Sequence, residues 1–354
     1  MGDIRQAISY NDCLLVPRSS DLLHLNEANI IYKYDHFDSY PIINAPMDSI
    51  CSAPLLNCLN RDFNLPITIH RWFETAKQQI EFFESCGNLY DRSVFVAVGS
   101  VLKWEGWIER LIEYQIKTEK KFGYLVDMAN GDTESCVKTV KYLKDHAFID
   151  CNIMAGNVAT RSGFDRLQEA GANFIRVGIG GGSICSTRQQ CGFGIPTLTS
   201  VIDCAKVKET AFLIADGGIE SPGDIAKSIA CGADMVMLGK MLAATNLSAG
   251  EKLDKDKNST TKEEEYYYVK YRGMASKEAI QHLNSVKSSV SVEGVSGLIR
   301  YKGTTSDVMN GILGNLRSSV GYYGGCRTLK EFQRKVKIIQ ISQQGWEESK
   351  TRVE

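Results

Sequence analysis

Short apolar runs recur along the first 240 residues and alternate with amphipathic stretches. The runs are rich in Val, Ile, Leu, Met and Phe and lack regular polar alternation. Continuous apolar runs of this kind are typical of parallel strands that are buried on both faces. Eight strands are therefore predicted, at residues 41–46, 66–70, 93–99, 123–129, 151–156, 173–178, 211–216 and 234–239.

The stretches between these runs have helical spacing. Residues 75–87, 134–146 and 221–234 read as amphipathic helices. The last of them begins with Ser221 and Pro222, which suit an N-cap and a first helical position. Eight alternations of strand and helix favour an α/β fold, a (β/α)8 TIM barrel, over an open doubly wound sheet, and we expect residues 1–354 to form one catalytic domain.

The pattern breaks after the eighth predicted strand. Residues 250–265, GEKLDKDKNSTTKEEE, are polar and dense in charge, which fits a mobile flap and a solvated linker equally well. We expect this flap and a C-terminal segment, at about residues 245–300, to be part of the barrel domain. Residues 307–324 are predicted to form a final helix, and residues 343–354 a tail.

Composition and charge narrow the range of partners. The 41 Lys and Arg against 42 Asp and Glu leave no basic surplus for nucleic acid or an anionic membrane. No apolar run approaches the roughly 20 residues of a membrane helix, and the first residues lack the apolar centre of a signal peptide, so we expect a cytoplasmic protein. The 11 cysteines include no CxxC pair, which argues against a disulfide framework or a zinc ribbon, and most should be buried.

Glycine-rich sequences follow the last two predicted strands. In a barrel of this kind the active site is built from loops at the carboxyl ends of the strands, and phosphate commonly binds after strands seven and eight. Glycine lets backbone N–H groups approach an anion, and a lysine adds positive charge, although each glycine alone also fits a plain turn. The candidates for a phosphorylated ligand are Asp216, Gly217, Gly218, Gly239 and Lys240.

The loop after the sixth predicted strand, RVGIGGGSICSTRQQCGFG, places Cys185 among glycines and hydroxyl residues. Cysteine attacks as its thiolate, whose formation is favoured by nearby N–H dipoles or a cation. Cys185 is therefore either a nucleophile at the rim of the barrel or a buried thiol beside a flexible turn. The glycine carbonyls of the same loop could bind a monovalent cation.

Polar residues after two earlier strands belong to the same rim. Asp127 and Asn130, in VDMANGD, either point into the opening or form a turn that enters a helix. His70, in ITIHRW, either contacts a ligand or is a rim histidine whose hydrogen bonds are satisfied within the protein.

Taken together, these sequences resemble the IMP dehydrogenase and GMP reductase family along nearly the whole chain. The resemblance is carried by NDCLLVPRSS, NAPMDSI, AGNVAT, VGIGGGSICSTR, ADGGIESPGDIAKSIACGADMVMLG, KYRGMAS and EGVSG. The Gly-Ser-Ile-Cys-x-Thr loop, followed later by Asp-Gly-Gly, is highly specific for this family.

The resemblance implies covalent chemistry on a purine nucleotide in a homotetrameric enzyme. Cys185 would attack purine C2, while Thr187 and Glu293 would move protons. The residues implied for the nucleotide are Met47, Ser183, Asp216, Gly217, Gly218, Gly239, Lys240, Tyr271, Gly273, Met274 and Ala275. Those implied for the nicotinamide cofactor are His70, Arg71, Asp127, Asn130 and Gly131, and the carbonyls of Gly180, Gly182 and Cys185 would bind K⁺.

Two reactions divide the family. The dehydrogenase oxidises IMP with NAD and hydrolyses the adduct with water activated by an Arg–Tyr pair, whereas the reductase releases ammonia from GMP and accepts a hydride from NADPH. Residues 273–299, where the pair should lie, contain neither arginine nor tyrosine. In addition, DMANG resembles the reductase sequence after the fourth strand. The resemblance thus favours a GMP reductase that uses NADPH, with NADH as the alternative cofactor.

Three other functions stay open: an IMP dehydrogenase, a reductase of a related purine nucleotide, and a noncatalytic nucleotide-binding protein. Three positions depart from the reductase pattern. Arg71 stands where lysine is usual, Lys240 replaces glycine or serine beside the phosphate, and Val290 replaces an arginine. A noncatalytic protein needs the phosphate loops but no nucleophile, so the joint presence of the cysteine and its proton-transfer partners argues for an enzyme.

Overall fold

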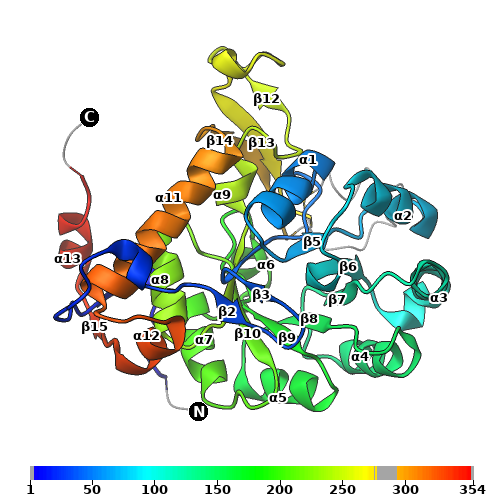
Figure 1. Ribbon diagram of the computed structural model, residues 1–354, viewed down its shortest axis with the longest axis horizontal. Coiled ribbons are helices and arrows are strands. Elements are labelled where there is room, and N and C mark those ends of the chain that lie inside the picture. Colours follow the sequence, from blue (N-terminus) through cyan, green and yellow to red (C-terminus); the bar gives the residue numbers. More distant parts are fainter. Residues whose placement is uncertain (1–3, 275, 277–292, 352–354) are drawn as a thin grey trace.

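The computed structural model describes residues 4–274, 276 and 293–351. Its central sheet has eight parallel strands: β4 (Ile42–Asn44), β5 (Ile67–Ile69), β6 (Val94–Val98), β7 (Gly123–Asp127), β8 (Ile153–Val158), β9 (Phe174–Val177), β10 (Phe212–Asp216) and β11 (Met235–Leu238). They follow the order β4-β11-β10-β9-β8-β7-β6-β5 and form a nearly closed barrel (Figure 1). Seven of them lie within predicted apolar runs, and β8 begins in the run at 151–156 and extends two residues beyond it. The (β/α)8 prediction is therefore confirmed.

The seam between β4 and β5 is closed by side chains. Asn44 Nδ2 donates to the Thr68 carbonyl at 2.9 Å, and the Thr68 N–H donates to Asn44 Oδ1 at 2.8 Å. The Thr68 hydroxyl donates to the Asn44 carbonyl at 2.8 Å, and both side chains are fully buried. Backbone groups that would otherwise be buried without partners at this seam are therefore satisfied.

Helices cover the outside of the barrel. A covering helix follows each barrel strand along the chain, and these helices are α1 (Ala53–Asn57), α2 (Ala76–Ser85), α3 (Val101–Thr118), α4 (Glu134–His146), α5 (Arg161–Glu169), α7 (Thr197–Ala205), α8 (Pro222–Ala230) and α11 (Thr305–Ser318). The three predicted helices correspond to α2, α4 and α8. Ser221 caps α8 as predicted: its hydroxyl accepts from the Asp224 N–H at 3.3 Å, and the Asp224 carboxylate accepts from the Ser221 N–H at 3.0 Å. None of the helices in the described ranges is long and apolar enough to cross a membrane.

A hairpin, β2 (Tyr32–Lys33) and β3 (Asp38–Ser39), packs against the amino-terminal end of the barrel. The Tyr34 ring lies 5.6 Å from Phe174 and 5.1 Å from Phe212, which are the first residues of β9 and β10. Aromatic packing therefore fills this end, and the carboxyl ends of the strands remain for a ligand.

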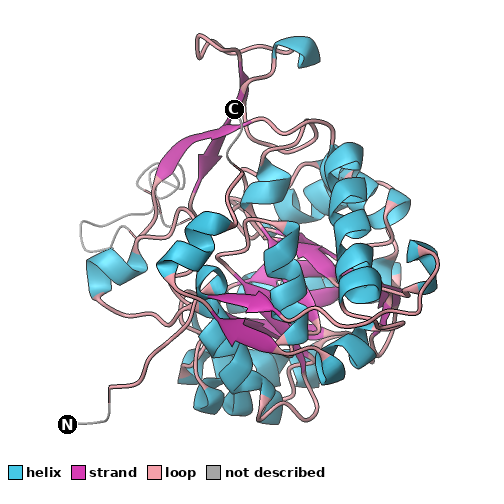
Figure 2. Ribbon diagram, turned by 90° about the vertical axis from the view of Figure 1, so that its left-hand side faces the viewer, coloured by secondary structure: helices cyan, strands magenta, loops and turns pink. Residues whose placement is uncertain are grey.

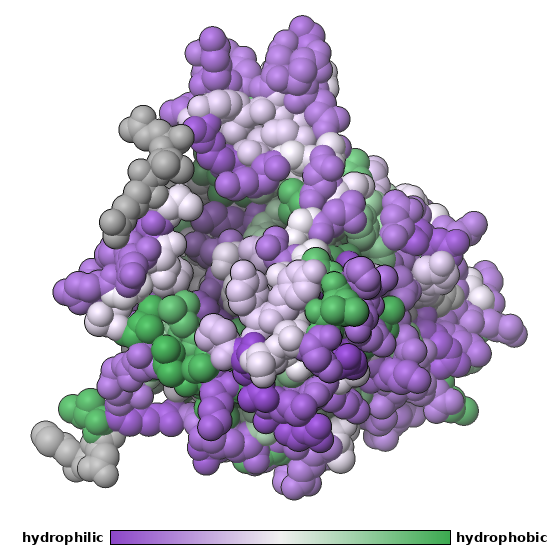
Figure 3. All heavy atoms as spheres, turned by 60° about the vertical axis from the view of Figure 1, so that its left-hand side comes forward, coloured by the Kyte–Doolittle hydropathy of each residue, from purple (hydrophilic) through white to green (hydrophobic). Residues whose placement is uncertain are grey.

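The polar segment after β11 belongs to a small antiparallel sheet that projects from the barrel (Figures 1 and 2). Its strands are β12 (Lys252–Leu253), β13 (Tyr268–Arg272) and β14 (Ser296–Arg300). Residues 261–265 are all exposed, and the projection has a hydrophilic surface (Figure 3). The predicted exposure is confirmed, but the segment is anchored by strands at its base rather than being a plain linker.

The prediction of a C-terminal tail is wrong. The predicted helix at 307–324 contains α11 but is not the last one, because α12 (Leu329–Lys335), β15 (Ile338–Gln340) and α13 (Gln343–Glu348) follow it. Strand β15 pairs antiparallel with β1 (Cys13–Leu15), with Cys13 opposite Gln340. The partner of β15 comes from the other end of the chain, so no local pattern announces this pairing.

Candidate active site

A cavity of about 420 Å³ opens at the carboxyl ends of the barrel strands. Loops after β4, β5, β7, β9, β10 and β11 form its wall, together with β13 and the residues just before β14. The predicted site residues that line it are Met47, Arg71, Asp127, Gly180, Gly182, Ser183, Cys185, Thr187, Asp216, Gly217, Gly218, Gly239, Lys240, Tyr271, Gly273, Met274 and Glu293. Ala275 and Val290 lie outside the described residues.

Cys185 is exposed in this cavity and is the first of three side chains that are joined by hydrogen bonds. Its thiol donates to the Thr187 hydroxyl at 3.2 Å, and that hydroxyl donates to Glu293 Oε2 at 2.8 Å. Proton transfer requires donor and acceptor within hydrogen-bond reach, and this chain of three side chains meets that condition. Of the two interpretations of Cys185, the buried thiol is excluded by its exposure.

Most other cysteines are buried, as expected. Burial raises the pKa of the Cys51 thiol to about 12, so this side chain stays protonated and behaves as a small apolar group. Cys191 is also exposed, but it does not line the cavity. Placement therefore distinguishes Cys185 from the other cysteines in the described ranges.

Backbone pairing fixes Glu293 against the cysteine loop. The Ser186 N–H donates to the Glu293 carbonyl at 2.9 Å, and the Val295 N–H donates to the Ile184 carbonyl at 3.0 Å. The Gly273 N–H in turn donates to the Val295 carbonyl at 3.0 Å. Residues before β14 thus join the loop to β13, and the carboxylate reaches Thr187 because of this pairing.

The loops after β10 and β11 form the end of the cavity proposed for phosphate. Gly217, Gly218 and Gly239 line it, and the Lys240 ammonium lies 3.2 Å from Glu220 Oε1 at its edge. The Tyr271 hydroxyl donates to Met47 Sδ at 3.8 Å. Burial raises the pKa of Tyr271 above its ordinary value, so its hydroxyl keeps its proton and remains a donor.

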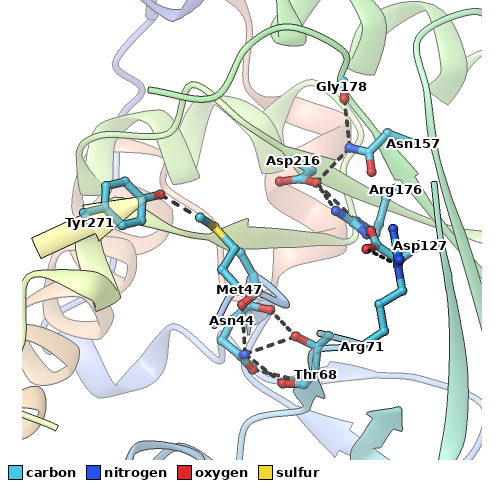
Figure 4. Close-up of polar contacts among 11 residues, drawn as sticks. Asn44, Met47, Thr68, Arg71, Asp127, Asn157, Arg176, Gly178, Asp216 and Tyr271 are labelled. Carbon is cyan, nitrogen blue, oxygen red and sulfur yellow. Dashed lines mark hydrogen bonds and ion pairs between the residues drawn. The ribbon is translucent and has the colours of Figure 1, made fainter. Parts of the chain in front are cut away.

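A row of charged side chains crosses the floor of the cavity (Figure 4). Arg71 Nε donates to Asp127 Oδ2 at 3.2 Å, and Arg176 Nη1 donates to Asp127 Oδ1 at 2.7 Å. Arg176 Nη2 and Asn157 Nδ2 both donate to Asp216 Oδ2, at 2.9 and 2.8 Å. Burial alone would raise the pKa of Asp127, but the guanidinium groups of Arg176 and Arg71 outweigh it and lower that pKa.

Arg176 and Asn157 are site residues that were not predicted from the sequence. They lie in NFIRVG, which predicts a buried strand, and in AGNVAT, which carries part of the family resemblance. The available signal was the polar side chain itself, because an arginine or asparagine in a strand buried on both faces needs a buried partner.

His70 does not join the cavity wall. It is 6% exposed, its ring stacks on Phe73 with centroids 4.4 Å apart, and its Nδ1 accepts from the Trp72 N–H at 3.1 Å. Burial lowers the pKa of His70 to about 4 and keeps the imidazole neutral. Of the two alternatives for His70, these contacts match the rim histidine whose hydrogen bonds are satisfied within the protein.

Asn130 and Gly131 also lie outside the cavity wall. Asn130 Oδ1 accepts from the Asp132 N–H at 3.1 Å, and the Gly131 N–H donates to the Asn157 carbonyl at 2.7 Å. A Cβ on Gly131 would come within 2.9 Å of the Gly156 backbone, so the close approach requires glycine. Asn130 and Gly131 form the turn that enters α4, whereas Asp127, Met128 and Ala129 line the cavity.

The cysteine loop fits a monovalent cation. Within the described ranges, the carbonyls of Gly180 and Cys185 accept no hydrogen bond, and that of Gly182 accepts only the Cys185 N–H, at 3.0 Å. Carbonyl oxygens with free lone pairs are the ligands that K⁺ takes. The same ranges hold no cluster of three or more His, Cys, Asp or Glu side chains suited to a metal ion.

Comparison with known proteins agrees with this geometry. Residues 7–352 match the family described as IMP dehydrogenase / GMP reductase domain. The chain is 31% identical to a GMP reductase of Vibrio cholerae serotype O1 and 30% identical to one of Vibrio atlanticus, in each case over 346 residues that cover 95% of both chains. It is 39% identical to an inosine-5′-monophosphate dehydrogenase of Nitrosopumilus maritimus over 237 residues, 64% of this chain and 48% of the relative. The chain therefore belongs to the IMP dehydrogenase and GMP reductase family of oxidoreductases.

Proposed function

We propose that this protein is a GMP reductase, which converts GMP, NADPH and a proton into IMP, ammonia and NADP⁺. The observation that carries the proposal is the relay from the Cys185 thiol through Thr187 to Glu293. Residues 273–299 also contain no Arg–Tyr pair to activate water. The relay suits the departure of an amine, because a leaving amine needs a proton. The full-length similarity to GMP reductases supports the same choice.

The first chemical step uses the chain's own side chains. The thiol proton of Cys185 passes through the Thr187 hydroxyl to Glu293, and the thiolate forms a C–S bond at purine C2. The bond from C2 to the exocyclic nitrogen then breaks, and the relay returns the proton to that nitrogen, which leaves as ammonia. When bound, the nicotinamide cofactor supplies the hydride that replaces sulfur at C2. Cys185 is released as the thiolate and takes up a proton from solvent, which restores the thiol for the next cycle.

The remaining residues would bind and orient the two ligands. Asp216, Gly218, Gly239 and Tyr271 surround the end of the cavity proposed for ribose and phosphate, and Lys240 adds positive charge at its edge. Asp127 and Arg71 would face the nicotinamide, with NADH as an alternative to NADPH. K⁺ would bind the carbonyls of the cysteine loop and hold its backbone. A cytoplasmic homotetramer without nucleic-acid or membrane partners completes the proposal.

An IMP dehydrogenase is the second candidate, because the chain is 39% identical to such an enzyme over 237 residues. In that reaction a water molecule must attack the purine adduct, and the residues that would activate it are missing from 273–299. A reductase of a related purine nucleotide and a noncatalytic nucleotide-binding protein remain as further outcomes of the test.

The test compares GMP plus NADPH with IMP plus NAD in K⁺ buffer, following the near-ultraviolet absorbance of the reduced cofactor and assaying ammonia in parallel. We expect absorbance loss and ammonia release with GMP. The Cys185→Ala variant should lose turnover, whereas the matched variant Cys191→Ser should keep it. A gain of absorbance with IMP and NAD would establish the dehydrogenase, and silence in both mixtures would point to another purine nucleotide or to binding alone.

A further inference from the structure

The floor of the cavity holds a guanidinium that the proton relay does not use. The Arg176 side chain is 8% exposed and contacts two carboxylates, those of Asp127 and Asp216 (Figure 4). A buried charge is tolerated only when it is paired and hydrogen-bonded. Asp127 and Asp216 both line the cavity. The Arg176 guanidinium, which neutralises both carboxylates, therefore also determines how they are oriented toward ligands.

Strand register explains how one side chain reaches both carboxylates. Asp127, Gly156 and Arg176 are paired partners in one row across β7, β8 and β9. Gly156 has no side chain, and a Cβ there would come within 2.8 Å of Arg176 Cβ. Arg176 therefore crosses β8 to reach Asp127 on β7, while Asp216 lies at the end of β10 on its other side.

The guanidinium divides its donors between the two carboxylates. Nη1 donates to Asp127 at 2.7 Å, whereas Nη2 and Nε donate to Asp216 at 2.9 and 3.2 Å. Burial alone would lower the pKa of Arg176, but the two carboxylates raise it, so the charge persists. A lysine offers a single ammonium without this planar fork, and it cannot hold both carboxylates in the same geometry.

We propose that Arg176 is a positioning residue that couples binding of the nucleotide to binding of the cofactor. The inference rests on the proposed function for assigning Asp216 to the nucleotide and Asp127 to the nicotinamide side. The first ligand to bind fixes its own carboxylate and the shared guanidinium, so the second ligand finds the other carboxylate already in place. Each ligand then tightens the other by the same factor, as linkage requires.

The experiment measures binding without turnover. In the Cys185→Ala background, isothermal titration gives the Kd of GMP with and without saturating NADPH, and the Kd of NADPH with and without GMP. We expect each ligand to tighten the other by about fivefold or more. Adding Arg176→Lys should reduce this factor to within about twofold of unity, although each ligand still binds alone.

A surface arginine provides the matched control. Arg166 also bridges two carboxylates, those of Asp132 and Glu134, but it is 42% exposed and lies outside the cavity wall. Arg166→Lys should leave the coupling factor unchanged. A merely structural role of Arg176 would lower the melting temperature of Arg176→Lys and leave the ratio of the two Kd values intact.

The outcomes separate the inference from the proposed function. If both ligands bind independently, or if Arg176→Lys keeps the coupling, the inference is wrong and the GMP reductase proposal stands. If neither GMP nor IMP binds, the proposed function is wrong, and the inference about coupling is wrong as well. Should Arg176→Lys not fold, Asp127→Asn keeps the contact between Arg176 and Asp216 and must also abolish the coupling; a coupling that survives would overturn the inference.

Discussion

At the residue scale, reactivity depends on where a side chain lies more than on its type. Cys185 is exposed beside a hydroxyl and a carboxylate, whereas burial raises the pKa of Cys51 to about 12 and leaves that thiol inert. The polar relay surrounds only the first of these two thiols. Substitutions at single positions of the relay therefore test the chemistry directly.

Substituting Glu293→Gln should leave GMP affinity within about twofold and slow ammonia release by about a hundredfold or more, because positioned proton transfer contributes that much or more. Rapid-quench measurement of ammonia, together with titration of GMP, checks both parts. Glu109→Gln, on the exposed side of α3, is the control and should change neither quantity. An unchanged rate of ammonia release in Glu293→Gln would remove this carboxylate from the relay.

His70 should make the protein sensitive to mild acid. Its pKa of about 4 in the folded protein lies below the ordinary 6.5, so the unfolded chain takes up the proton first as the pH falls. The free energy of unfolding should therefore decrease between about pH 6.5 and pH 4, by at most ~3 kcal/mol from this group. Urea unfolding over this range should show a shallower decrease in His70→Asn, whose side chain can still accept from the Trp72 N–H; parallel curves would contradict the assignment.

At the scale of elements, the site depends on segments that pair across the barrel rim. The cysteine loop between β9 and α6 (Thr187–Cys191) is held by the residues before β14, and β14 continues into the projecting sheet with β12 and β13. Hydrogen bonds thus join the projecting sheet to the cysteine loop. We expect nucleotide binding at the loop to change the mobility of the sheet.

Residues 250–265 should exchange amide hydrogen rapidly in the free protein and more slowly with GMP bound. Their side chains are largely exposed, and few of them are hydrogen-bonded into a strand. Hydrogen-exchange mass spectrometry would measure this, with β10 in the centre of the barrel as an internal reference that stays protected in both states. Strong protection of the segment without ligand would rule out a flap.

The hydrogen bonds between β4 and β5 should contribute to the stability of the barrel. Asn44→Ala removes the acceptor of the Thr68 N–H in a fully buried position and should lower the free energy of unfolding by about 1–3 kcal/mol. Asn315→Ala, on an exposed part of α11, is the control and should change it by less than about 0.5 kcal/mol. Chemical denaturation compares the two, and equal stabilities would show that the strand edges are held by other contacts.

At the scale of the whole molecule, two segments that are far apart in the sequence pair with each other, and large apolar side chains remain on the surface. Strand β1 pairs with β15, and nearby Leu23 and Tyr323 are 79% and 66% exposed. Contiguous exposed apolar patches commonly mark protein interfaces, and the face drawn in Figure 3 carries several hydrophobic patches. That residues 1–354 form a single catalytic domain stays a prediction.

The protein should behave as a homotetramer in solution. Sedimentation equilibrium is expected to give four times the 39.3 kDa mass of the chain. Tyr323→Glu, which places a charge on the exposed apolar surface, should weaken the assembly, whereas Tyr90→Glu, at a tyrosine that is 46% exposed elsewhere, should not. A monomer at every concentration would refute the tetramer and leave the barrel and the site as described.

Local sequence determined the strands, the helices and the candidate nucleophile. Apolar runs such as residues 93–99 report burial on both faces without reference to the rest of the chain, and Ser221 with Pro222 marks a helix start in the same local way. The sequence around Cys185 also contains its own family signature, because a nucleophile, a hydroxyl and permissive glycines must lie within a few residues of one another.

Only the tertiary structure decided which distant groups meet. Glu293 reaches Thr187 through backbone pairing, Arg176 reaches Asp127 across a glycine on the intervening strand, and His70 turns into aromatic packing instead of the cavity. These outcomes depend on strand register and on how loops converge at one end of a barrel. A one-residue change in register would move each side chain to the opposite face, and no local pattern of polar and apolar residues specifies that relation between segments far apart in the chain.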